Sequence, residues 1–116
     1  MKTLTGSNNQ WLVVELRVCR SVLGITQNQL AELSGMGIDS IKRLERKGAE
    51  PKYSTINKLR HIFLHLGVKC HIDDNGTTRI KMRNSLVTAI NEGRLKEYVN
   101  ERAESYDADA MPEVFE

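Results

Sequence analysis

The chain lacks most features that would mark a secreted, membrane-bound or disulfide-stabilised protein. It has two cysteines, Cys19 and Cys70, and neither belongs to a CxxC motif, so we interpret them as two reduced thiols. No apolar run is long enough to cross a bilayer, and polar residues interrupt the first 20 positions, which argues against a membrane span and a signal peptide. We therefore expect a cytoplasmic protein of one domain with no membrane partner.

Catalytic patterns are missing as well. The sequence has no phosphate-cradling glycine loop, no Ser-His-Asp order with a recognisable elbow, and no carboxylate pair with its own pocket signal. His61 and His65 stand four apart, with Cys70 and His71 following, a spacing that zinc could use. Surface histidines and a packed thiol explain this spacing more simply. We expect no enzyme, no catalytic residue, no metal and no cofactor.

The chain does carry an uneven distribution of charge. Its net charge is only +2, but residues 1–96 hold 16 lysines and arginines against 8 acids, whereas residues 97–116 hold one arginine against 7 acids. A basic body thus precedes an acidic tail. This asymmetry indicates a polyanionic partner for the body.

Capping signals mark the first two helices. Ser7 and Gln10 have capping-box spacing ahead of an apolar pattern with helical period. Thr26 and Gln29 repeat that spacing before a short second helix over 27–34. In a capping box, each side chain satisfies a backbone amide of the first turn.

Two further helices follow before residue 67. A third is expected over 37–47, where Gly48 stops it, and a fourth over 53–66 after Pro51. The helical period predicts that five residues of the fourth helix face inward: Ile56, Leu59, Ile62, Phe63 and Leu66.

After Gly67 the apolar period changes from near 3.6 to 2. The segments 68–72 and 78–82 alternate around Asn75-Gly76, which is a strong hairpin turn signal. A two-stranded hairpin alone is marginal in water. A helix, or a hairpin from a second subunit, must therefore cover its apolar residues, which we predict to be dimerisation residues: Val68, Cys70, Ile72, Ile80 and Met82.

The rest of the chain is helical and then acidic. Residues 85–106 predict helix with a break at Gly93, and residues 107–116 predict an acidic, flexible tail. We thus expect a core over 7–66, and a hairpin with a helix over 67–106 as the dimerisation element.

The third helix has one apolar and one basic face. Ile41 and Leu44 share one side, whereas the opposite side carries Asp39, Lys42, Arg43 and Arg46. Seven cations stand against two acids between residues 42 and 60. A charge run alone is most simply a solvated face. The glycine turn GMG before this helix changes that interpretation, because a short helix braced by another across a tight turn is the geometry that enters the DNA major groove.

The stretch 25–66 also resembles the helix-turn-helix of the Cro/CI-type repressor family, often called the XRE family. The matching segments are ITQNQLAEL, GMG, SIKRLERKG and Pro51, which fall in order without a gap. The resemblance covers residues 12–66 and implies a mainly α, lambda-repressor-like helix-turn-helix core. Lys52 departs from it, since the family often has a small capping residue there. The long fourth helix and the hairpin after it resemble the subset of the family in which a helix and a β-hairpin follow the DNA-binding core.

The resemblance implies a double-stranded DNA operator as the partner. Gln27 would hydrogen-bond a phosphate and brace the reading helix, and Arg20 would pair with Glu45 as an internal clamp. The implied DNA-binding positions are Thr26, Gln27, Asn28, Gly37, Ile38, Asp39, Ser40, Lys42, Arg43, Arg46, Lys47 and Lys52.

The side chains on the reading helix suit different contacts. Ile38 can touch a thymine methyl, Asp39 can accept from a cytosine amino group, and Arg43 can reach guanine O6 and N7. Asp39 could instead serve the helix dipole, and Lys42 and Arg43 could meet phosphates alone. The sequence leaves these alternatives open.

Two functions follow from these patterns. The first is a homodimeric repressor, because one reading helix covers few base pairs and a two-fold pair would span two half-sites. The second is an antitoxin that binds a basic toxin through residues 97–116 and regulates its own operon. The same tail could simply be solubilising or autoinhibitory, and activation rather than repression stays open.

Overall fold

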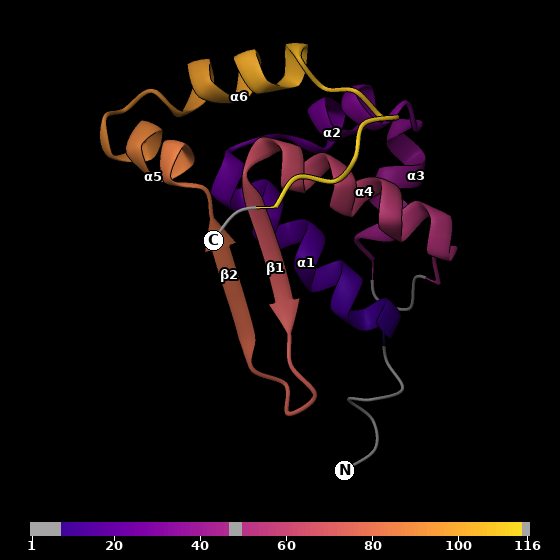
Figure 1. Cartoon of the computed structure of the whole chain (residues 1–116). Coiled ribbons are helices and arrows are strands. Elements are labelled where there is room, and N and C mark those ends of the chain that lie inside the picture. Colours follow the sequence, from indigo (N-terminus) through magenta and orange to yellow (C-terminus); the bar gives the residue numbers. More distant parts are fainter. Residues whose placement is uncertain (1–7, 47–49, 115–116) are drawn as a thin grey trace.

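The computed structural model describes residues 8–46 and 50–114, with side chains described from Val13 onward. The described residues are mainly helical, with one hairpin (Figure 1), which confirms the predicted fold class. Ser7, Lys47 and Gly48 lie outside these ranges. In chain order, the elements are α1 (Asn8–Leu23), α2 (Gln27–Ser34), α3 (Ile38–Leu44), α4 (Tyr53–Leu66), β1 (Val68–Ile72), β2 (Thr78–Met82), α5 (Asn84–Asn91) and α6 (Leu95–Glu104).

Local signals set the ends of α2. The Thr26 hydroxyl accepts a hydrogen bond from the Gln29 backbone amide, and the Gln29 side chain accepts one from the Thr26 amide, so the predicted capping box is present. Gly35 ends the helix in the left-handed conformation, with φ 71°. The second helix therefore has the predicted bounds.

The third helix is shorter than the sequence predicts. It begins after Gly37 and ends at Leu44, not at residue 47, because the backbone of Glu45 leaves helical geometry. The fourth helix begins at Tyr53, and Lys52 precedes it without a side-chain capping hydrogen bond. Lys52 thus occupies the N-cap position without capping the helix, as expected where the small capping residue of the family is missing.

The core lies where the first four helices meet. Leu16 of α1, Leu30 of α2, Ile41 of α3 and Leu59 of α4 are all fully buried. Burial of one such side chain stabilises the fold by about 1.5–3 kcal/mol. The inward face predicted for α4 is confirmed, since all five of its residues are buried: Ile56, Leu59, Ile62, Phe63 and Leu66.

The hairpin has the predicted strands and turn. β1 and β2 pair antiparallel, with Val68 opposite Met82 and Cys70 opposite Ile80. Because opposite residues share one face of a hairpin, these four side chains point to the same side. β1 packs on α1 and α4, which bury Val68 and Cys70, whereas Ile80 on β2 stays 44% exposed. The protein's own helices thus cover β1 and leave β2 partly open.

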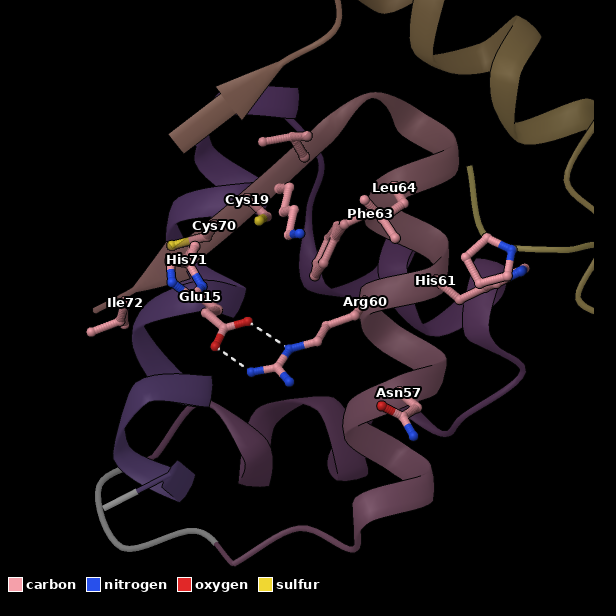
Figure 2. A pocket seen from close by; sticks show the side chains of 13 residues that line it. Glu15, Cys19, Asn57, Arg60, His61, Phe63, Leu64, Cys70, His71 and Ile72 are labelled. Atoms are coloured by element: carbon pink, nitrogen blue, oxygen red, sulfur yellow. Dashed lines mark hydrogen bonds and ion pairs between the residues drawn. The ribbon is translucent and has the colours of Figure 1, made fainter. Parts of the chain in front are cut away.

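A cavity of about 690 Å³ opens between α1, α4 and β1 (Figure 2). Arg60 of α4 reaches Glu15 of α1 there, with hydrogen bonds of 2.9 and 2.6 Å. Cys19 and Cys70 are free thiols on the same cavity wall. Burial, with smaller contributions from Cys70 and Glu15, raises the pKa of Cys19 far above its usual value. A thiol with a raised pKa stays protonated and unreactive, as expected of packed, reduced cysteines.

Close packing at Gly67 joins the hairpin to the C-terminal helices. Gly67 has φ 100°, and a Cβ at this position would lie 2.6 Å from the Tyr98 hydroxyl and 3.2 Å from the Arg83 Cβ. The Tyr98 hydroxyl donates to the Leu66 carbonyl over 3.0 Å. Gly93, with φ 73°, separates α5 from α6 at the predicted break.

The acidic tail differs from the expectation of a flexible segment. Residues 105–114 turn back after α6 and lie along α4 (Figure 1). Tyr106 contacts His61, and Glu113 pairs with His65, Arg83 and Arg102. These partners lie up to 48 residues away in the sequence, so local composition gave no sign of them.

Candidate nucleic-acid interface

The fold presents one face of α3 outward. Ile41 is fully buried and Leu44 is 8% exposed, so the helix is anchored by its apolar side. Lys42 and Arg43 are exposed on the other side. α3 lies across the molecule from β2 (Figure 1). The separation into one apolar and one basic face is therefore present as predicted.

The cations of this face are available to a ligand. Among the described residues, no ion pair involves Lys42, Arg43 or Arg46, whereas arginines elsewhere, such as Arg20 and Arg60, are paired with buried carboxylates. Asp39 is also exposed, in the first turn of α3. The exposed cations Lys42, Arg43 and Arg46 give this surface a positive potential, which attracts an anion.

The first turn of α3 brings three implied contact residues together. Gly37 precedes the helix in an extended conformation, with no side chain to cap it. Asp39 is exposed, while Ile38 and Ser40 are half-buried. Ile38 packs partly against the core cluster, so part of its apolar surface is already used within the protein.

A clamp joins the end of α3 to α1. The Arg20 guanidinium donates to both carboxylate oxygens of Glu45, over 2.6 and 2.7 Å, and Glu45 is 3% exposed. Arg20 also donates to the Ile25 carbonyl at 3.0 Å. The hydrogen bond to Glu45 raises the pKa of Arg20 above its usual value, although burial opposes this. The expected pairing of these two residues is thus confirmed.

Two more side chains contribute to the clamp. The Gln27 amide donates to Glu45 Oε1 at 3.2 Å, which links the start of α2 to the end of α3. Arg17 donates to the Glu45 carbonyl at 2.7 Å, a contact that the sequence analysis missed. The sequence does contain a signal for this contact: Arg17 lies three residues before Arg20 and therefore on nearly the same face of α1.

The remaining implied positions surround α3. Asn28 is exposed on α2, and Thr26 uses its hydroxyl oxygen as the helix cap. Arg46 is exposed just beyond α3, and Lys52 is exposed before α4. Lys47 lies outside the described residues. Side chains from the start of α2, from α3 and from the start of α4 therefore make up the candidate interface.

Other kinds of site find no support in the described part of the chain. No group of three or more metal-binding side chains is present within residues 8–46 and 50–114. None of the helices described there is both long and apolar enough to span a bilayer. His61 and His65, considered above as metal ligands, instead contact the C-terminal segment.

Comparison with known proteins gives one match. Residues 22–63, which run from the end of α1 almost to the end of α4, match the family model described as helix-turn-helix. No curated protein and no solved structure matches the chain. The matched segment contains α2, α3 and two residues of the clamp, Gln27 and Glu45, whereas Arg17 and Arg20 precede it.

Proposed function

We propose that the protein is a dimeric repressor that reads double-stranded DNA with α3; its residues 22–63 are a helix-turn-helix of the Cro/CI (XRE) type, which DNA-binding transcription regulators use. The exposed cations of a helix whose end is clamped, which form no ion pair with any described residue, carry this proposal. A helix of seven residues is about 10 Å long, and the major groove, about 12 Å wide, accepts one helix with its side chains.

The clamp supports this function because it keeps the reading helix in place. Gly37 begins α3, and Glu45 fixes its end to α1 and α2 through Arg20 and Gln27. A helix fixed in this way loses little conformational entropy on binding. Its base contacts then depend on the position of the whole domain on the DNA.

We assign base recognition to the outward face of α3. Arg43 reaches guanine and Asp39 accepts from cytosine, while Ile38 uses its remaining exposed surface against a thymine methyl. Cations around α3 contact phosphates and provide affinity without sequence preference. In this assignment, Lys42 faces base edges beside Arg43. The phosphate contacts come from Arg46, Lys47 and Lys52, with Gln27, Asn28 and Thr26 at the start of α2.

The dimer surface must be narrower than the sequence suggested. Val68 and Cys70 are buried in the protomer's own core, so their side chains cannot also contact a second subunit. Ile80 is 44% exposed, and Ile72 and Met82 are half-buried. We propose that a second copy covers the open side of β2 around Ile80.

The second candidate function, an antitoxin, rests on the C-terminal segment. Met111 is 85% and Val114 is 90% exposed in a segment rich in acids, and exposed apolar anchors among acids suit a basic partner protein. Such a partner would have to bind the segment where it lies along α4, or displace it. A co-purifying basic protein would favour this alternative.

Selection of binding sites from a random duplex library tests the proposed function. A dimer that reads DNA with two copies of α3 should enrich a two-fold symmetric site with half-sites about one helical turn apart. Enrichment of a single short site would reject the dimer while keeping α3 as the reader. No enrichment over the input library would reject sequence-specific reading.

A further inference from the structure

The C-terminal segment is held on the body of the protein by polar contacts. It leaves α6 at Ser105, passes His61 and then reaches His65, one turn further along α4. The Tyr106 ring lies 5.4 Å from both imidazole rings, edge to face. Two histidines on one face of α4 therefore contact a segment that is more than 35 residues away in sequence.

The partners of His61 suit a neutral imidazole. Its Nε2 lies 2.7 Å from the Ala110 carbonyl, which can only accept, so Nε2 carries the proton. Its Nδ1 lies 2.7 Å from the Tyr106 hydroxyl, which can donate to it. Both hydrogen bonds form without a charge on this ring. His61 can thus hold the segment as a neutral ring.

Each ring nitrogen of His65 has an acceptor as its nearest partner. Nε2 lies 2.7 Å from the Arg102 carbonyl, and Nδ1 lies 2.5 Å from the Glu113 carboxylate. Both partner groups are acceptors, so a neutral ring can satisfy only one of them. The imidazolium satisfies both and also forms an ion pair with Glu113.

Glu113 connects these contacts. Its carboxylate accepts from Arg83 at 2.5 Å and from Arg102 at 2.7 and 3.0 Å, in addition to His65. Burial raises the pKa of Glu113, but the hydrogen bond from His65 and the charges of Arg102 and Arg83 outweigh it, so the pKa lies below its usual value. The Glu113 carboxylate therefore anchors the segment. Its site is formed by His65 of α4, Arg83, which directly precedes α5, and Arg102 of α6.

We propose that His65, Arg83 and Arg102 form a carboxylate-binding site for the chain's own C-terminal segment, residues 106–114, and that protonation of His65 controls how firmly this segment is closed on α4. With His65 charged, the site holds Glu113 through three cationic groups. With His65 neutral, one hydrogen bond is lost and an imidazole lone pair faces either the carboxylate or the carbonyl. Arg83 and Arg102 then hold Glu113 without the histidine.

The charged groups around His65 determine the direction of this effect. Arg102 lies 3.5 Å from His65 Nδ1 and opposes its charge, whereas Glu113 favours it. Tyr106 and Ser105 contact the ring as uncharged groups, and His61, on the same helix, is satisfied without a charge. Closure is therefore favoured at pH values where His65 is protonated and weakens as the pH rises.

Closure of the segment on α4 affects how a partner protein could bind the segment. The exposed Met111 and Val114 are presented from the closed segment on either side of Glu113. A protein that needs the Glu113 carboxylate must compete with His65, Arg83 and Arg102. Whether the acidic segment is available to a partner thus depends on the protonation of His65. It also depends on any acidic peptide that takes the place of Glu113 in the site.

Amide NMR of the full-length protein between pH 6 and pH 8.5 tests the proposal. The signals of Ala110 and Met111 report whether the segment is closed or open, and the His65 ring nitrogens report its protonation. We expect the closed-to-open ratio to fall roughly tenfold as His65 loses its proton, because one hydrogen bond between charged groups is lost; tenfold corresponds to about 1.4 kcal/mol.

Two variants make the result specific. His65→Gln carries no titratable proton, so the segment should be more open and its remaining closure independent of pH over this range. His71→Gln is the matched control, because His71 is an exposed histidine of β1 whose partner is Asp73, and it should keep the wild-type pH dependence. The signals of α1–α3 verify that each variant is folded. A wild-type segment that is equally closed at both pH values, or a pH dependence that persists in His65→Gln, would overturn the proposal.

Discussion

Glu45, directly after α3, accepts two hydrogen bonds from the Arg20 guanidinium of α1, although 25 residues separate them in sequence. The same carboxylate accepts from Gln27 at the start of α2. One buried acid thus fixes the relative positions of three helices. The orientation of α3, and with it the proposed interface, depends on a contact that itself touches no ligand.

Removal of one partner of this clamp should destabilise the fold and weaken DNA binding together. Arg20→Ala leaves Glu45 buried without its charge partner, which we expect to lower the free energy of unfolding by about 3 kcal/mol. Urea denaturation measures this loss. Arg79→Ala is the control, because Arg79 pairs with Asp73 on the exposed hairpin, where an ion pair contributes about 0–1 kcal/mol. Equal losses in both variants would contradict the role assigned to Glu45.

Gly67 and Gly35 should respond differently to alanine. Both have positive φ, so each substitution costs about 1 kcal/mol for the backbone conformation. A Cβ at Gly35 meets nothing within 4 Å, whereas a Cβ at Gly67 would collide with the Tyr98 hydroxyl. We predict that Gly67→Ala lowers the free energy of unfolding by about 1–3 kcal/mol more than Gly35→Ala does. Similar losses in the two variants would show that the space around Gly67 does not matter.

The sequence predicted the elements whose signals are local. The capping box at Thr26, the Asn75-Gly76 turn and the inward face of α4 each depend on residues within one helix or hairpin, and each is present in the structure. The family resemblance added the pairing of Arg20 with Glu45. Strand alternation also indicated that β1 has a buried face, but not that α1 and α4 of the same protomer cover it.

Contacts between distant segments account for the differences. α3 ends at Leu44, and the residue after it, Glu45, is held in the clamp by Arg20 of α1. The tail looked flexible because its composition is acidic, and its docking depends on His65 and Arg83, which are 48 and 30 residues from Glu113. Neither contact leaves a periodic pattern in the chain.

A charge on the open side of β2 should separate the proposed dimer. Ile80→Glu places a carboxylate where we expect the second copy to pack, and because Ile80 is 44% exposed in the protomer, the monomer should stay folded. Analytical ultracentrifugation should show wild-type dimer and variant monomer at the same concentration. Lys81→Glu, on the opposite face of the same strand, should remain a dimer. An unchanged dimer in Ile80→Glu would move the interface elsewhere.

Acid should open the C-terminal segment only below the usual range of a glutamate. The folded-state pKa of Glu113 is lowered, so the contribution of its carboxylate to closure is complete above the unfolded pKa, about 4.3, and is lost as the pH falls through the lower folded value. The amide signals of Ala110 and Met111 should therefore stay in their closed positions at pH 4.5. In Glu113→Gln, the segment should be more open than in the wild type at every pH above the folded-state pKa of Glu113. Opening of the wild-type segment between pH 5 and 4.5 would contradict the lowered pKa.

The most direct test of α3 as the reader is DNA binding by a Lys42→Ala/Arg43→Ala variant. Fluorescence anisotropy would compare its binding to the DNA upstream of its own gene with binding to random DNA, at 50 and 200 mM salt. Lys69→Ala/Lys81→Ala, which removes two exposed cations from the hairpin, is the matched control. We predict that the α3 variant loses selectivity for the upstream DNA and that its salt slope is smaller by up to about 2, while the control keeps both. Wild-type selectivity in the α3 variant, or equal weak binding of the wild type to both DNAs, would contradict the proposed function.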